Sequence, residues 1–159
     1  MINILVLCTG NSCRSVLGEA LLNHLGSGRV KAYSAGSKPI GRTNVNAVKV
    51  LAKHGVNTEG FTSQSWNEYE NKKIDIAITV CDNAANEQCP VYMESIVRGH
   101  WGLFDPAHMK GTDAEIDAAF EKAFAVTESR VKAFLALPFE EFSPEKLTQE
   151  LNGIGNIND

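Results

Sequence analysis

The chain of 159 residues has no long apolar run and no excess of basic residues. None of its apolar stretches approaches the roughly 18 residues that a membrane-spanning helix needs. Its start, Met1 to Asn3, lacks the basic region of a signal peptide. The 15 Lys and Arg against 19 Asp and Glu give a net charge of −4, which offers no basic stripe for nucleic acid. We therefore expect a cytoplasmic protein that binds neither a membrane nor nucleic acid.

Metal-binding and redox spacings of cysteine are also missing. The chain has four cysteines, at positions 8, 13, 81 and 89. Seven residues separate Cys81 from Cys89, so neither a Cys-x2-Cys zinc knuckle nor a Cys-x-x-Cys redox pair is present, and no His stands at ligand spacing. Thiols stay reduced in the cytoplasm, where cysteines are more often catalytic than structural. We predict no metal site.

One cysteine stands where a strand meets a helix. Cys8 follows the apolar run Ile4–Leu7, which is too short for anything but a buried strand. Apolar residues over 16–25 then recur at helical spacing. Five residues separate Cys8 from Arg14. The intervening loop therefore lies at a helix N-terminus, where backbone N–H groups and the helix dipole favour an anion.

This loop predicts an oxyanion site with a nucleophile beside it. The proposed anion-binding residues are Thr9, Gly10, Asn11, Ser12, Cys13 and Arg14. The guanidinium of Arg14 can clamp a tetrahedral anion with two hydrogen bonds, and Ser15 stands beside the thiol. The same field should lower the pKa of Cys8 from about 8.5 into a range of roughly 3.5 to 7.5. The alternative is that Cys8 is an ordinary core cysteine.

Strand and helix patterns alternate along the rest of the chain. Further strands are predicted over 30–34, 75–80 and 95–99, and helices over 45–54, 63–72 and 113–137. Thr112 and Glu115 form a capping-box signature, and Gly55 suits a helix end. Such alternation with short links indicates an α/β fold with a parallel sheet and a site at the carboxyl ends of its strands.

The last part of the chain carries less information. Ser143 before Pro144 is a sound helix start. Residues 152–159 hold Gly and Asn with little apolar content, so we expect a frayed tail. We divide the chain into one main domain over 1–137 and a C-terminal extension over 138–159.

Three motifs together resemble the low-molecular-weight protein tyrosine phosphatase family, and within it the three-cysteine arsenate reductases. They are Cys-Thr-Gly-Asn-Ser-Cys-Arg-Ser at 8–15, Ser-Ala-Gly at 34–36 and His-Trp-Gly-Leu-Phe-Asp-Pro-Ala at 100–107. The resemblance spans about residues 2 to 136. It implies a single three-layer domain with a four-stranded parallel sheet flanked by helices. It also implies Cys8 as nucleophile, Asp105 as proton donor or base, and a role in arsenic resistance.

The resemblance further implies a thiol relay. Arsenate reduction takes two electrons from thiols, and Cys81 and Cys89 fall where the relay cysteines of such reductases stand. Cys8 would attack arsenate, Cys81 would release arsenite by forming a disulfide with Cys8, and Cys89 would resolve it. A helix over 82–88 would have to loosen for the last step. Thioredoxin is the preferred external reductant, and glutathione with glutaredoxin is the alternative.

Two other functions stay open at this point. The first is a phosphatase acting through a phospho-cysteine at Cys8. It is disfavoured because phosphatases of this family usually place an aromatic residue where Ala107 stands, although weak phosphatase activity is compatible with the motifs. The second is a silent anion-binding or partner-docking module. The complete set of Cys8, Arg14 and Asp105 argues against it.

Related reductases place potassium at positions that match Asn11, Glu19 and Ser34, but their acidic fourth ligand aligns with Gln64. A neutral amide is a weaker ligand for a hard cation, so potassium is not predicted, nor is any tightly bound cofactor. Three further residues are assigned supporting roles: His100 and Trp101 should support the loop that carries Asp105, and Cys13 should pack inside the anion loop, with a protective Cys8–Cys13 disulfide as the alternative.

Overall fold

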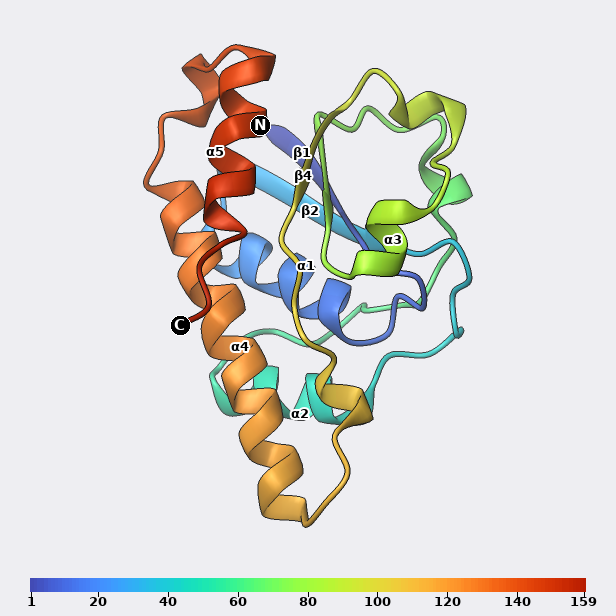
Figure 1. Cartoon of the computed structure of the whole chain (residues 1–159), viewed down its shortest axis with the longest axis vertical. Helices are drawn as coiled ribbons and strands as arrows, with labels where there is room; N and C mark the ends of the chain where they lie inside the picture. The colour runs from blue at the N-terminus through green and yellow to red at the C-terminus, as the bar shows by residue number, and fades with distance from the viewer.

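A computed structural model describes residues 1–159 and contains one sheet of four parallel strands. The strands are β1 (Ile2–Leu7), β2 (Val30–Ala35), β3 (Ile76–Thr79) and β4 (Val97–His100). Their order across the sheet is β2-β1-β3-β4 (Figure 1). The expected α/β fold with a four-stranded parallel sheet is confirmed. The ends of β1 and β3 meet at one edge of the sheet, and Cys8 and Cys81 follow them there.

Helices lie on both sides of the sheet, and the longer ones lie on one side. The α-helices are α1 (Arg14–Leu25), α2 (Val45–Lys53), α3 (Asp82–Asn86), α4 (Asp113–Leu135) and α5 (Pro144–Ile154). Four 3-10 turns are η1 (Trp66–Tyr69), η2 (Val91–Met93), η3 (Pro106–His108) and η4 (Phe139–Glu141). Figure 1 shows α4 and α5 along one side of the sheet and the short α3 on the other.

Alternation within β1 builds two cores. Successive side chains of a strand point to opposite faces, so Ile4 and Val6 join the larger core with α1 and α4. Leu5 and Leu7 join a smaller one on the face that η1 and η2 cover. All four side chains are at most 3% exposed. An apolar strand with no alternation of polarity is what a sheet buried on both faces requires.

The helix ends follow the expected local chemistry. Thr112 and Glu115 form a capping box at the start of α4, and Gly55 adopts a left-handed φ of +75° just beyond α2. The helix predicted over 63–72 is wrong. Only the η1 turn forms, because the preceding segment runs extended beside the sheet: Gly36 donates to the carbonyl of Gln64, and Trp66 donates to that of Gly36.

The C-terminal extension is fixed rather than frayed, which corrects the expectation for residues 152–159. The helix α5 packs on β4, and Ile154 is buried. The buried Arg130 of α4 donates to the carbonyls of Gly155 and Ile157 at 3.1 and 2.9 Å. These bonds satisfy a guanidinium that is only 2% exposed and tie down the tail. The division at residue 137 stays a prediction.

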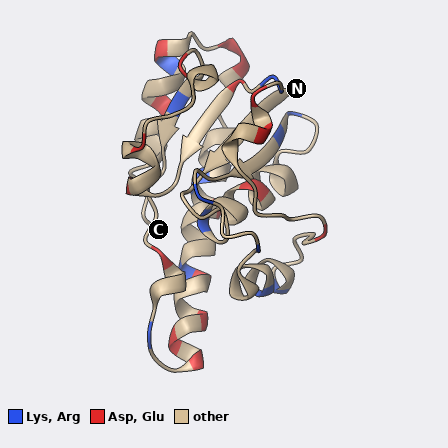
Figure 2. Cartoon of the chain, turned by 90° about the vertical axis from the view of Figure 1, so that its right-hand side faces the viewer, with Lys and Arg blue, Asp and Glu red and all other residues tan.

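Apart from the buried Arg130, most charged side chains lie at the surface, in mixed signs (Figure 2). Figure 2 shows acidic residues on the first turns of α4, where Asp113 and Glu115 complement the positive end of the helix dipole. No helix combines the length and the apolar character that crossing a membrane requires.

Candidate active site

The loop over residues 9–14, between β1 and α1, curves around the proposed anion site. Asn11 has a φ of 45°, the only non-glycine residue with a positive φ, and this turns the chain sharply in the middle of the loop. The carbonyls of Thr9, Gly10 and Ser12 face outward, where they accept from backbone N–H groups of residues 38, 40 and 44 at 2.7 to 3.0 Å. None of the amides of residues 9–14 donates to a backbone carbonyl. The amides of residues 10–14 are therefore available to an anion.

Gly36 explains the second motif. A Cβ at this position would lie 2.3 Å from the carbonyl oxygen of Thr9 and 2.5 Å from that of Cys8. Only glycine therefore lets β2 run this close to the loop. The Cys8 amide also donates to the carbonyl of Ala35 at 3.2 Å, which anchors the nucleophile's backbone to β2.

A buried polar network supports the loop from behind. The side-chain amide of Asn11 donates to Ser15 Oγ at 2.8 Å and to Ser34 Oγ at 2.9 Å. Its oxygen accepts from the backbone N–H of Gln64 at 2.8 Å. Asn11, Ser15 and Ser34 are fully buried. This network holds the left-handed turn, so Ser15 and Ser34 shape the anion site from outside it.

Arg14 is oriented by the loop that follows β4. Its Nη1 donates to the carbonyl of Leu103 at 3.0 Å, and its Nη2 lies 3.5 Å from Asp105 Oδ2. Asp105 also caps η3 by accepting from the amide of Ala107 at 2.9 Å, and His108 Nδ1 lies 3.4 Å away. The structure therefore brings Asp105 to the mouth of the anion loop, 91 residues after Arg14.

Cys8 and Cys81 form a pair across the ends of β1 and β3. Both residues are buried in the same core cluster, and each thiol perturbs the pKa of the other. Cys81 caps α3, and its sulfur accepts from the amide of Ala84 at 3.4 Å. The hydrogen bond from Cys8, together with the amides of Thr9 and Ala84, lowers the pKa of Cys81 to about 5.

The pKa of Cys8 differs from the expectation. Its hydrogen bond to Cys81 and its burial raise its pKa, while Arg14 and the Gly10 amide act in the lowering direction. Two neighbouring buried thiols hold one negative charge more easily than two, and Cys81 takes it because the amides of Thr9 and Ala84 also stabilise its thiolate. The low pKa that we expected for Cys8 thus falls on its partner Cys81.

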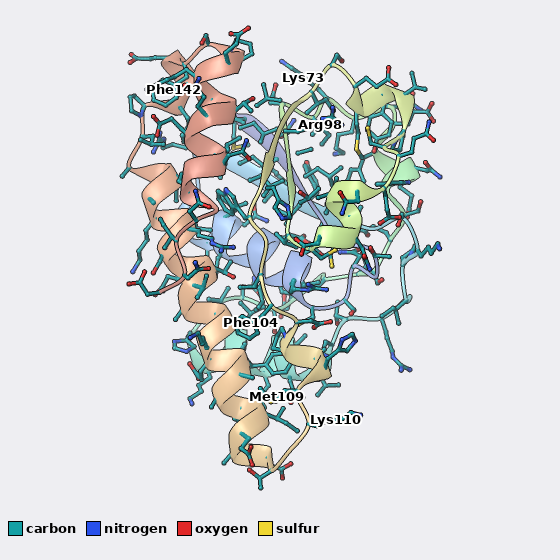
Figure 3. All side chains as sticks on the ribbon, in the orientation of Figure 1. Lys73, Arg98, Phe104, Met109, Lys110 and Phe142 are labelled. Carbon is teal, nitrogen blue, oxygen red and sulfur yellow. The ribbon has the colours of Figure 1, made fainter.

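The other two cysteines lie in different surroundings. Burial, followed by the nearby Asp105 charge, raises the pKa of Cys13 to about 12, so it packs as a neutral thiol. Cys89 is half-buried and accepts from Arg98 Nη1 at 3.0 Å. Arg98, labelled in Figure 3, comes from β4. Cys89 and Arg98 line a pocket of about 330 Å³ together with His100. Cys89 therefore stands apart from the Cys8–Cys81 pair.

The positions implied for potassium do not fit a cation. Gln64 Nε2 donates to the carbonyl of Ser34 at 2.6 Å and to the Tyr69 hydroxyl at 2.9 Å. A cation there would need these oxygens as ligands, but an N–H group already occupies them. Glu19 accepts from Ser34 Oγ at 2.5 Å. Burial raises its pKa to about 7, as expected for a carboxyl group without a positive partner.

His100 and Trp101 have separate tasks. Trp101 is buried, donates from Nε1 to the carbonyl of Leu151 at 2.9 Å, and starts the loop that carries Asp105. His100 instead connects β3 to α3: its Nδ1 lies 2.7 Å from Thr79 Oγ1, and its Nε2 lies 3.2 Å from Asp82 Oδ1. The supporting role is thus met by Trp101, while His100 holds the start of the Cys81 segment.

Comparison with known proteins agrees with this geometry. The profile of the family described as low molecular weight phosphotyrosine protein phosphatase matches residues 3–151. The chain belongs to this phosphatase family. Within it, the chain is 36% identical over 131 residues to the arsenate reductase of Bacillus subtilis, covering 82% of this chain and 93% of the relative. The arsenate reductase of Bacillus licheniformis is 38% identical over 132 residues, with the same coverage.

Solved structures of the phosphatase family share the fold. An arsenate reductase in the phosphate-binding state superposes with a TM-score of 0.71 at 23% identity, covering 86% of this chain and 98% of that one. At this identity the likeness shows the fold alone.

Several residues at the site carry no sequence motif. Gln64 and Glu87 approach the loop only through tertiary contacts: Gln64 binds Asn11, and Glu87 accepts from Thr9 Oγ1 at 2.8 Å. Glu87 lies in a polar stretch that reads as a solvated helix face. No spacing in the sequence could have indicated either contact, because both join segments more than 50 residues apart.

Proposed function

We propose that this chain reduces arsenate to arsenite, with Cys8 as the nucleophile. The observation that carries the proposal is that Cys81 lies next to Cys8, because the two cysteines follow the paired ends of β1 and β3 and are buried in one cluster beside the anion loop. Hydrolysis of a phosphate ester needs one thiol, whereas reduction needs a second thiol that can attack the first. The Bacillus relatives, which match over most of the chain, are named arsenate reductases.

The first step joins arsenate to Cys8. Arsenate binds to the amides of residues 10–14, and Arg14, which Leu103 orients, contributes the two-pronged contact. Arg14 and the Gly10 amide favour the thiolate of Cys8, which gives up its proton to water, and the Cys8 sulfur then attacks arsenic. An arsenic–oxygen bond breaks, and Asp105 at the mouth of the loop supplies a proton to the oxygen that leaves as water.

The second step reduces arsenic. Cys81 loses its proton, attacks the Cys8 sulfur, and a Cys8–Cys81 disulfide forms. The electron pair of the sulfur–arsenic bond stays on arsenic, which passes from the +5 to the +3 state and leaves as arsenite. The features that lower the pKa of Cys81, the amides of Thr9 and Ala84, stabilise the attacking thiolate.

The third step moves the disulfide to a position where an external reductant can reduce it. Cys89 attacks Cys81, which frees Cys8 and forms a Cys81–Cys89 disulfide. Bridged residues have Cα atoms only about 4.4 to 6.8 Å apart, and Cys89 starts beside Arg98, so α3 has to unwind. Thioredoxin is the preferred reductant, with glutathione and glutaredoxin as the alternative. Weak hydrolysis of aryl phosphates is expected as a side activity, because it needs only Cys8, Arg14 and Asp105.

A single-turnover series tests the relay. Cys89→Ser should release about one equivalent of arsenite and stop at a Cys8–Cys81 disulfide, which peptide mapping detects. Cys81→Ser should release no arsenite yet keep aryl phosphate hydrolysis, and Cys8→Ser should lose both. Sustained arsenate reduction by both Cys81→Ser and Cys89→Ser, with thioredoxin as sole reductant, would favour the phosphatase instead.

A further inference from the structure

The segment between Cys81 and Cys89 is held to the body mainly by polar contacts. Between these two cysteines only Ala84 is buried. At the start of the segment, Asp82 pairs with His100. Towards its end, α3 stops at Asn86, and Glu87 turns the chain back to an extended conformation. A short helix with so little buried surface opens at low free-energy cost once its polar contacts break.

Glu87 makes the contacts at the Cys89 end. One carboxylate oxygen accepts from Thr9 Oγ1 at 2.8 Å, and the other accepts from Ser37 Oγ. Asp82 and Asp105 each form an ion pair with a basic side chain. No Lys, Arg or His lies within ion-pair distance of the Glu87 carboxylate. An uncompensated negative charge is therefore tied to the first residue of a loop built for an anion.

We propose that Glu87 is a positioning residue that latches the Cys81–Cys89 segment closed on the anion loop until a bound oxyanion releases it. The role in the relay rests on the proposed reductase function. The latch joins a residue two positions before Cys89 to the residue next to Cys8. Its state therefore decides whether Cys89 can leave Arg98.

The release follows from like charges in one place. A bound arsenate or phosphate dianion brings two negative charges to amides that begin at Thr9, beside the Glu87 carboxylate. The anion also competes for the Thr9 hydroxyl as a hydrogen-bond donor. Each effect favours the open latch when the loop is filled. By reciprocity of coupling, the closed latch must weaken anion binding by the same factor.

The consequence is an ordered relay. When no anion is bound, Glu87 keeps α3 helical and holds Cys89 apart from Cys81. A disulfide between these two thiols therefore does not form before the substrate binds. With the loop filled, the segment loosens when its third cysteine is needed.

Phosphate affinity gives the first test. Inorganic phosphate, measured by titration calorimetry at pH 7.5, should bind Glu87→Gln at least about fivefold more tightly than wild type, the lower end of ordinary coupling factors. A merely structural role would not tighten binding. The exposed Glu94, which has no polar partner, supplies the matched control, and Glu94→Gln should bind like wild type. Unchanged or weaker binding by Glu87→Gln would overturn the latch.

Hydrogen exchange of the segment gives the second test. In wild type, phosphate should speed exchange of amides 84–89 by about threefold or more while protecting those of the anion loop. Glu87→Ala should exchange this fast without phosphate, and phosphate should add nothing. In Ser37→Ala, which loses one of the two hydroxyl partners, exchange should fall between wild type and Glu87→Ala. Equal exchange rates in wild type with and without phosphate would refute the release.

These measurements separate the latch from the reductase proposal. Neither uses arsenate, a reductant or turnover, so a phosphatase with a working latch would still pass both tests. Conversely, a reductase whose relay runs as proposed but whose segment ignores phosphate would fail them. The cysteine series then supports the function while the latch is withdrawn.

Discussion

Replacing Glu19 by Gln should stabilise the folded protein at pH 8 far more than at pH 5. Burial raises the pKa of Glu19 from 4.5 to about 7, so the folded state prefers the protonated carboxyl group. Its contribution to stability is fully present below the unfolded pKa and is lost as pH rises through the folded one. The Ser34 hydroxyl, which donates to Glu19, provides no positive charge to offset ionisation.

The size of the effect follows from linkage. A shift from 4.5 to about 7 costs the wild type about 2.5 kcal/mol between pH 5 and pH 8, at 1.36 kcal/mol per unit. Glu19 also borders a surface hollow of about 420 Å³, and screening by water there reduces the expected figure to about 2 kcal/mol. Gln keeps the acceptor for Ser34 but does not titrate, so the difference between the two proteins isolates this group.

Thermal unfolding at pH 5 and pH 8 measures the prediction. An advantage of about 2 kcal/mol corresponds to a gain of roughly 4 to 8 °C in Tm for a chain of this size. The scans should be run in potassium and in choline salts, with Glu94→Gln as the control for loss of an exposed charge. If the difference between Glu19→Gln and wild type stays constant from pH 5 to pH 8, Glu19 is not a neutral buried carboxyl group. Potassium-dependent stability of the wild type would contradict the Gln64 geometry.

Two further outcomes are expected. Asp105→Asn should slow formation of the first disulfide by roughly 10²- to 10⁴-fold in a single turnover, since the amide keeps the shape but gives up no proton; an unchanged rate would remove Asp105 from the chemistry. Arg130→Met should cost about 3 to 5 kcal/mol in urea unfolding because buried carbonyls lose their donor, and limited proteolysis should then cut the C-terminal tail. The exposed Arg42→Met should change neither, and a similar loss there would point to a general effect of charge.

The sequence alone determined the anion loop and its place in the fold. A four-residue apolar run, a thiol, and a helical pattern after Arg14 can be arranged in few ways, since local sterics and periodicity decide each element. The parallel α/β class and the caps at Thr112 and Ser143 followed for the same reason: each depends on residues within a few positions of one another.

Only the tertiary structure decided what surrounds the loop. Gln64 lies in an extended segment and not in a helix because its backbone pairs with that of Gly36, 28 positions earlier in the chain. The charge of the resting thiol pair falls on Cys81 because β1 and β3 are neighbours in the sheet. Glu87 contacts Thr9 through the same adjacency. Contacts of this kind depend on which strands pair, and pairing is a property of the whole chain's packing that no local pattern encodes.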